Sequence, residues 1–155
     1  MQVMTASYVK GTLPEVHLKA FRLSQRLIGF GFKVLRIKVE STCFNPGVPV
    51  TDAEAHALSA HNYFEFHWKL RLPPGYEHAA LQSRVAAHGA RLSRSALRTL
   101  TCGFQHRFVT QRLYDVGRDS ALRRLEALTA ELRSHGYEIS STISEPRGSN
   151  PQRGI

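Results

Sequence analysis

The order of the elements predicted from the sequence indicates an α+β protein. Amphipathic segments with helical spacing each end at a glycine, and each is followed by a segment with the two-residue alternation of a β-strand. Over about 62–145 the order is β-α-β-β-α-β, which is the ferredoxin-like arrangement, and an additional β-α-β unit precedes it at about 2–40. We therefore expect one α+β domain over residues 1–145, with the helices layered on one face of a mixed sheet. The turn-rich segment 146–155 is expected to be a mobile C-terminal tail.

The prediction of the first β-α-β unit, at about 2–40, depends on a capped amphipathic helix. Thr12 and Glu15 form a capping-box pattern at the start of an apolar stripe over residues 13–30. The helix is followed by a β-branched, alternating segment at 33–40, which is typical of a strand. Residues 2–9 are predicted as the weaker first strand of the same unit.

The ferredoxin-like part is predicted from alternation, helical spacing and turn residues. A connector over 41–59 contains a short helix, opened by a second capping box of Thr51 and Glu54. The predicted strands are 63–72, 91–95, 104–114 and 137–143, and the predicted helices are 76–88 and 119–135.

The composition is that of a basic protein, and the chain is long enough to bury one hydrophobic core. The chain has 155 residues and a formal net charge of +9, and it contains no Asp or Glu between His78 and Tyr114. Such a block creates a positive local potential, which favours an anionic partner. Two cysteines, the lack of a signal-peptide pattern at the start and the short apolar runs favour a cytoplasmic location, with no membrane as a partner.

Alternation along residues 63–72 separates an apolar face from a charged face. Phe64, Phe66 and Trp68 share one side with the leucines, and these side chains are expected to meet the helices. The other side carries Tyr63, Glu65, His67, Lys69 and Arg71, and the same alternation in 33–40 adds Arg36, Lys38 and Glu40. The strand over 104–114 has apolar residues on both sides, and we assign Arg112 with Thr110 to the charged face.

These residues supply the candidate site. Glu65 and His67 lie two apart on one strand, so they are candidates for an acid–base pair, and they are the predicted catalytic residues. A short basic segment around Arg94 offers guanidinium and hydroxyl donors to a phosphate. The predicted ligand-binding residues are Arg36, Lys38, Lys69, Arg71, Arg94 and Arg112. No metal-ligand spacing and no cofactor motif is present, so neither a metal nor a cofactor is expected.

Three functions remain open at this point. The first is a binding module whose charged sheet face holds an anionic small molecule or an acidic partner, through phosphate or carboxylate groups. The second is a small enzyme acting on a phosphorylated metabolite, and the third is an assembly protein that forms a homodimer through the sheet. RNA-recognition domains share the β-α-β-β-α-β order but stack bases on aromatic rings of the sheet. Because the rings are predicted to point inward here, apart from Tyr63, nucleic acid is not the favoured partner.

Overall fold

The computed structural model describes residues 4–58, 60–142 and 153–154. The chain divides into two compact units, one formed by Met1–Val39 with Gly154–Ile155 and the other by Glu40–Arg153. The expectation of a single domain over 1–145 stays a prediction, and the two units are described one after the other. The predicted mobile tail lies outside the described residues, except for the short strand β7 (Arg153–Gly154).

The first unit is built on helix α1 (Leu13–Gly29). Its N-terminus is capped as predicted, because the backbone N–H of Thr12 donates to a carboxylate oxygen of Glu15 at 2.7 Å. Gly31 follows the helix with φ +82°, a left-handed conformation that favours glycine.

Among the described residues, no helix is long and apolar enough to cross a bilayer.

The predicted β-α-β form of this unit is wrong. Residues 4–10 form no strand, and residues 2–3 lie outside the described part of the chain. Of the predicted strand at 33–40, β1 (Lys38–Val39) alone is formed, and it pairs with β7 in a two-stranded sheet. An alternating pattern becomes a strand only where a second strand completes the hydrogen-bond ladder, and within the described part of the chain no strand pairs with the rest of 33–40.

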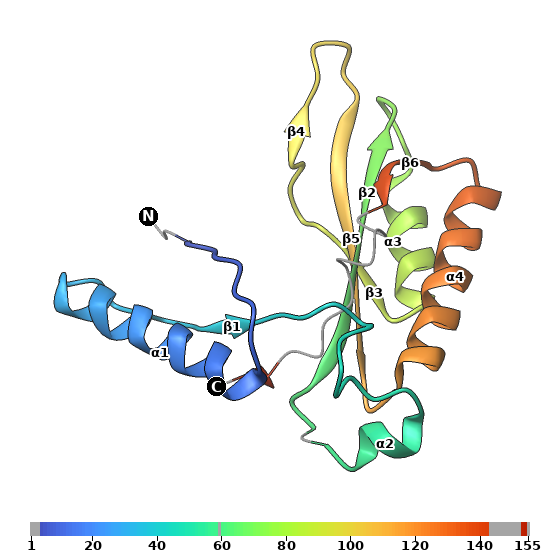
Figure 1. Ribbon diagram of the computed structural model, residues 1–155. Coiled ribbons are helices and arrows are strands. Elements are labelled where there is room, and N and C mark those ends of the chain that lie inside the picture. The colour runs from blue at the N-terminus through green and yellow to red at the C-terminus, as the bar shows by residue number, and fades with distance from the viewer. Residues whose placement is uncertain (1–3, 59, 143–152, 155) are drawn as a thin grey trace. The chain divides into compact units, whose positions relative to one another are not determined.

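The second unit contains the larger sheet (Figure 1). Its first short helix, α2 (Asp52–His56), is opened by the predicted capping box of Thr51 and Glu54. The remaining elements are β2 (Tyr63–Leu72), α3 (His78–Ala87), β3 (Ala90–Leu92), β4 (Arg98–Thr99), β5 (Gln105–Tyr114), α4 (Arg118–Ser134) and β6 (Glu138–Thr142). The sequence predicted each of these elements except β4, with boundaries that differ by a few residues at most.

The strand order in this sheet is β3-β5-β2-β6, and β4 also pairs with β5. The pairings of β2 with β5, β2 with β6, β3 with β5 and β4 with β5 are antiparallel, so the expected mixed sheet is not what this unit forms. The reason lies in the connections. α3 joins β2 to β3 and α4 joins β5 to β6, and in both cases another strand lies between the two that the helix connects.

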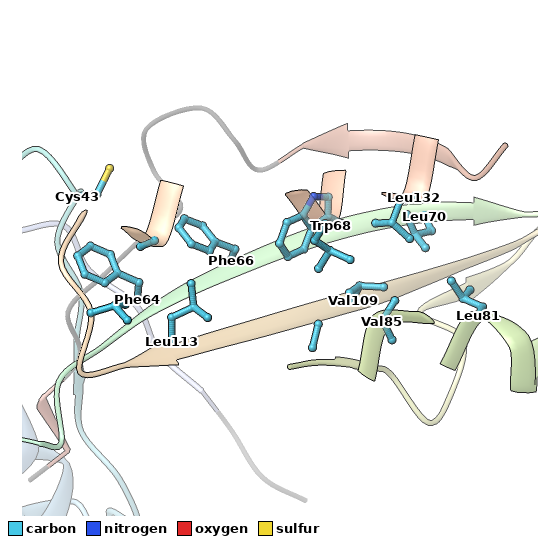
Figure 2. Close-up of a cluster of buried hydrophobic side chains, with 14 of the residues drawn as sticks. Cys43, Phe64, Phe66, Trp68, Leu70, Leu81, Val85, Val109, Leu113 and Leu132 are labelled. Carbon is cyan, nitrogen blue, oxygen red and sulfur yellow. The ribbon is translucent and has the colours of Figure 1, made fainter. Parts of the chain in front are cut away.

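The core lies between this sheet and the helices α3 and α4, which stand on the same side of it (Figure 1). Trp68 is 0% exposed, and its indole N–H donates to the hydroxyl of Thr129 on α4 at 2.9 Å. His67, its neighbour on β2, has a side chain that is 36% exposed. The predicted parity of β2 is therefore confirmed. Figure 2 shows the buried side chains along β2 and β5, with Leu81 and Val85 from α3 and Leu132 from α4.

The connector anchors the start of α4. The backbone N–H of Gly117 donates to Asp52 Oδ1 at 2.8 Å, and the Ser120 hydroxyl donates to Asp52 Oδ2 at 2.9 Å. The next two backbone N–H groups, of Arg118 and Asp119, donate to carbonyls of the connector. These bonds satisfy donors that the first turn of a helix leaves without an intrahelical partner, and they fix α4 behind the sheet.

Candidate functional site

The face of the sheet opposite α3 and α4 carries the candidate site, and we call it the charged face. The antiparallel register of β2 and β5 is continuous, so residues of the two strands face each other in rows. The rows of the charged face are Tyr63 with Tyr114, Glu65 with Arg112, His67 with Thr110, Lys69 with Phe108, and Arg71 with His106. Arg112 and Thr110 therefore lie where the sequence placed them.

Residues of the outer strands extend the row of His67 with Thr110 and the row of Arg71 with His106. Arg91 of β3 is the register partner of Thr110, and Arg98 of β4 is the partner of His106. On the opposite edge, Glu138 of β6 is paired with Arg71 in the register. Cations from β3 and β4 thus join those of the two central strands on one face.

Glu65 is a buried carboxylate at one end of the charged face. The residue is 3% exposed, and its Oε1 accepts a hydrogen bond from Arg112 Nε at 2.6 Å. This hydrogen bond raises the pKa of the Arg112 guanidinium, because a bound carboxylate stabilises the cation. An ionised carboxylate is costly to bury without a partner, and the ion pair with Arg112 offsets part of this cost for Glu65.

His67 connects this ion pair to a hydroxyl. Its Nε2 lies 3.7 Å from Glu65 Oε2, and its Nδ1 lies 3.0 Å from the hydroxyl oxygen of Thr110. The arrangement is a chain of hydroxyl, imidazole and carboxylate, the group order that supports proton transfer from a hydroxyl. The predicted acid–base pair is brought together, and Thr110 is added to it. Alternation along the sequence already assigned Thr110 to the charged face, but its contact with His67 follows only from the register between two strands far apart in the sequence.

A cluster of cations lies at the other end of the face, around His106. Burial lowers the pKa of the His106 imidazole, and the positive charges of Lys69, Arg71 and Arg98 lower it further. Arg71 is paired with Glu138 at 2.9 Å. Within the described part of the chain, no acidic side chain forms an ion pair with Lys69 or Arg98. The cluster therefore contains two cations, Lys69 and Arg98, that no acidic side chain of the described residues pairs with.

Aromatic rings share this face, which corrects the prediction that they point inward. Phe108 lies opposite Lys69, and its ring centroid is 6.2 Å from that of His67 in an edge-on arrangement. The rings of Tyr63 and Tyr114 are 4.9 Å apart, and Tyr114 is 47% exposed. The physical reason is that Leu113 and Val109 point to the helices in a strand without a bulge, so residues of the even parity must face the other way.

The remaining predicted ligand-binding residues lie elsewhere. Arg36 and Lys38 belong to the first unit, and their part in the site stays a prediction. Arg94 is exposed in the segment between β3 and β4, where its backbone carbonyl accepts a hydrogen bond from the Arg107 guanidinium at 2.9 Å. The hydroxyl of Ser93 donates to the carbonyl of Ser95 and accepts from the backbone of Phe108. That hydroxyl therefore serves the hairpin, and a phosphate-binding role of Arg94 also stays a prediction.

In the described ranges, no group of three or more His, Cys, Asp or Glu side chains is arranged to hold a metal ion. Cys43 is buried, Cys102 is exposed, and both are free thiols. The charged face combines cations, the hydroxyl–imidazole–carboxylate arrangement of Thr110, His67 and Glu65, and aromatic rings.

Comparison with known proteins does not add to this description, since no protein-family model, curated protein or solved structure matches the chain. Fold and site together define a class: an α+β protein with an open antiparallel sheet and helices on one side of it.

Proposed function

We propose that the protein is a binding module that holds an anionic, phosphate- or carboxylate-bearing ligand on its charged face. The observation that carries this proposal is the cluster of Lys69, Arg71 and Arg98 around His106, in which Lys69 and Arg98 have no acidic ion-pair partner among the described residues. Like charges that are held together repel one another, and a bound anion removes that repulsion. Guanidinium groups also match phosphate and carboxylate geometry with paired donors.

The experiment uses inorganic pyrophosphate as the probe and titration calorimetry as the readout. We expect Lys69→Gln and Arg98→Gln each to weaken binding about 5- to 10-fold, corresponding to ~1–1.4 kcal/mol. Arg133→Gln is the matched control, because Arg133 is exposed in the last turn of α4 and carries the same charge. Affinity should also fall as salt is raised. Equal affinities for the control and both cluster variants would contradict the proposal.

We further propose that the second unit has the ferredoxin-like topology that the sequence predicts. The support is its strand order, in which each helix crosses over one intervening strand of an antiparallel sheet. Exchange of backbone amides should then be slowest in β2 and β5, the two strands that have a neighbour on both sides.

A second candidate function is an enzyme acting on the bound phosphorylated ligand. The arrangement of Thr110, His67 and Glu65 favours it, because an imidazole within hydrogen-bond distance of a hydroxyl can accept its proton. The test is turnover of phosphomonoesters by the wild type, His67→Gln and Thr110→Val. If the protein binds pyrophosphate but turns over no phosphomonoester, the enzyme hypothesis is wrong and the binding-module proposal stands.

A further inference from the structure

We infer that the anionic partner is a single-stranded nucleic acid, whose bases stack on the rings of the charged face while its phosphates contact the neighbouring cations. This inference rests on the proposed function and names the class of its ligand. It also reverses the expectation drawn from the sequence, because that expectation assumed rings that point inward, and the register of β5 places Phe108 and Tyr114 on the charged face.

Rings and cations alternate on the face in a way that suits a polymer of bases and phosphates. Phe108 lies directly opposite Lys69, and Arg112 extends over the ring of Tyr63 at 5.4 Å from its centroid, next to Tyr114. Phe104, just before β5, has the Arg71 guanidinium 4.0 Å over its ring. Every base has an aromatic face, so side-chain rings bind bases without regard to sequence, and arginine and lysine hold the backbone beside them.

The positions of the rings indicate an extended ligand. Phe108 and Tyr114 are separated along β5 by about 20 Å, at ~3.4 Å per residue of an antiparallel strand. Tyr114 is exposed at one end of this span, Phe108 is half-buried at the other end, and the His67 imidazole lies beside Phe108. A ligand that meets both rings must carry several bases, whereas one phosphate group would occupy the cation cluster alone.

The same pattern disfavours an apolar docking partner. Thr110 and Arg112 lie between Phe108 and Tyr114 along β5, so polar side chains interrupt the rings of the face, whereas an apolar protein surface would favour a continuous patch. The acidic residues of the face do not oppose an anionic chain, since Glu65 is bonded to Arg112 and Glu138 to Arg71.

The test compares two ligands on the wild-type protein: a fluorescent ten-nucleotide single strand of mixed sequence, and a strand of the same length and charge that lacks all bases. We expect the strand with bases to bind at least tenfold more tightly, because stacking adds to the phosphate contacts. Tyr114→Leu and Phe108→Leu should each reduce that preference several-fold and leave the base-free strand unaffected. Phe44→Leu is the control, since Phe44 is an exposed ring that lies under Arg118 outside the charged face.

The outcomes separate this inference from the proposed function. Equal binding of the two strands, with Lys69→Gln still weakening both, overturns the inference and leaves an anion-binding module. If Lys69→Gln and Arg98→Gln leave binding unchanged, both this inference and the proposed anion-binding function are overturned. Tighter binding of a duplex than of the single strand, or full competition by polyglutamate at equal charge, also overturns the inference, the latter in favour of an acidic protein surface.

Discussion

Glu65 and Arg112 face each other across β2 and β5, and the Arg112 Nε lies 2.6 Å from a carboxylate oxygen of Glu65. The two side chains differ in their contact with water, since that of Glu65 is 4% exposed and that of Arg112 is 48% exposed. Removing one partner therefore has unequal consequences. Loss of the guanidinium leaves a buried carboxylate without this donor, whereas loss of the carboxylate charge leaves an arginine that water can still solvate.

We expect Arg112→Ala to lower the free energy of unfolding by about 2 kcal/mol, less than the ~3–5 kcal/mol typical of a fully buried pair. Glu65→Gln should cost about half as much or less, because its amide oxygen still accepts from Arg112. Urea unfolding at neutral pH measures both. Similar losses in the two variants, or a larger loss for Glu65→Gln, would contradict the asymmetry.

The sequence correctly predicted which side chains of β2 face the core, because the same alternation holds along the strand. Apolar residues alternate without exception with charged residues and His67 from Phe64 to Leu72, and two prolines follow. Both the face of each side chain and the end of the strand could therefore be predicted. β5 was ambiguous because apolar residues occupy both parities, and its register against β2 was needed to place Leu113 inward and Phe108 outward. The chain from Thr110 through His67 to Glu65 depends on that same register, so no spacing within one strand reveals it.

The sequence failed where an element depends on a distant partner. Residues 4–9 form no strand, and of 33–40 Lys38–Val39 alone do, although residues 35–40 alternate regularly between apolar and charged side chains. The short strand β4 shows the reverse case. Its pattern is weak, yet it pairs with β5 because the hairpin turn at Gly103, with φ +79°, brings it alongside.

Gly117 lies close against the backbone of the connector. A Cβ at this position would stand 2.3 Å from the backbone carbonyl carbon of Thr51, and backbone atoms cannot move aside as a side chain can. We expect Gly117→Ala to destabilise the protein by about 2 kcal/mol or more. Gly29→Ala is the control: apart from its chain neighbours and its own helix backbone, no atom lies within 4 Å of its added Cβ, so it should stabilise α1 by up to ~1 kcal/mol. Thermal unfolding of the two variants should move in opposite directions, and parallel shifts would refute this steric account.

Asp52 makes the same junction sensitive to acid. The backbone N–H of Gly117 and then the hydroxyl of Ser120 lower the pKa of the Asp52 carboxyl, because both donate to its charged form. A carboxyl whose folded pKa is lowered stabilises the fold above its unfolded pKa, near pH 4, and that stability is lost as pH falls through the folded pKa. Asp52→Asn should therefore be less stable than the wild type at pH 7, and the difference should shrink at pH 3. A difference that is constant between these two pH values would show that the carboxylate charge has no part in the junction.

His106 reports the state of the cation cluster without requiring knowledge of the natural ligand. Burial and the charges of Lys69, Arg71 and Arg98 lower its pKa in the free protein. A phosphate group bound among these cations offsets their charges, so we expect saturating inorganic pyrophosphate to raise the His106 pKa toward its ordinary range. In the free protein, Lys69→Gln should raise it in the same direction and reduce the change that pyrophosphate causes. The measurement is an NMR titration of the imidazole signals, with His56 on α2, outside the cluster, as the internal control. A His106 pKa that stays fixed when pyrophosphate is bound would place the anion elsewhere on the protein.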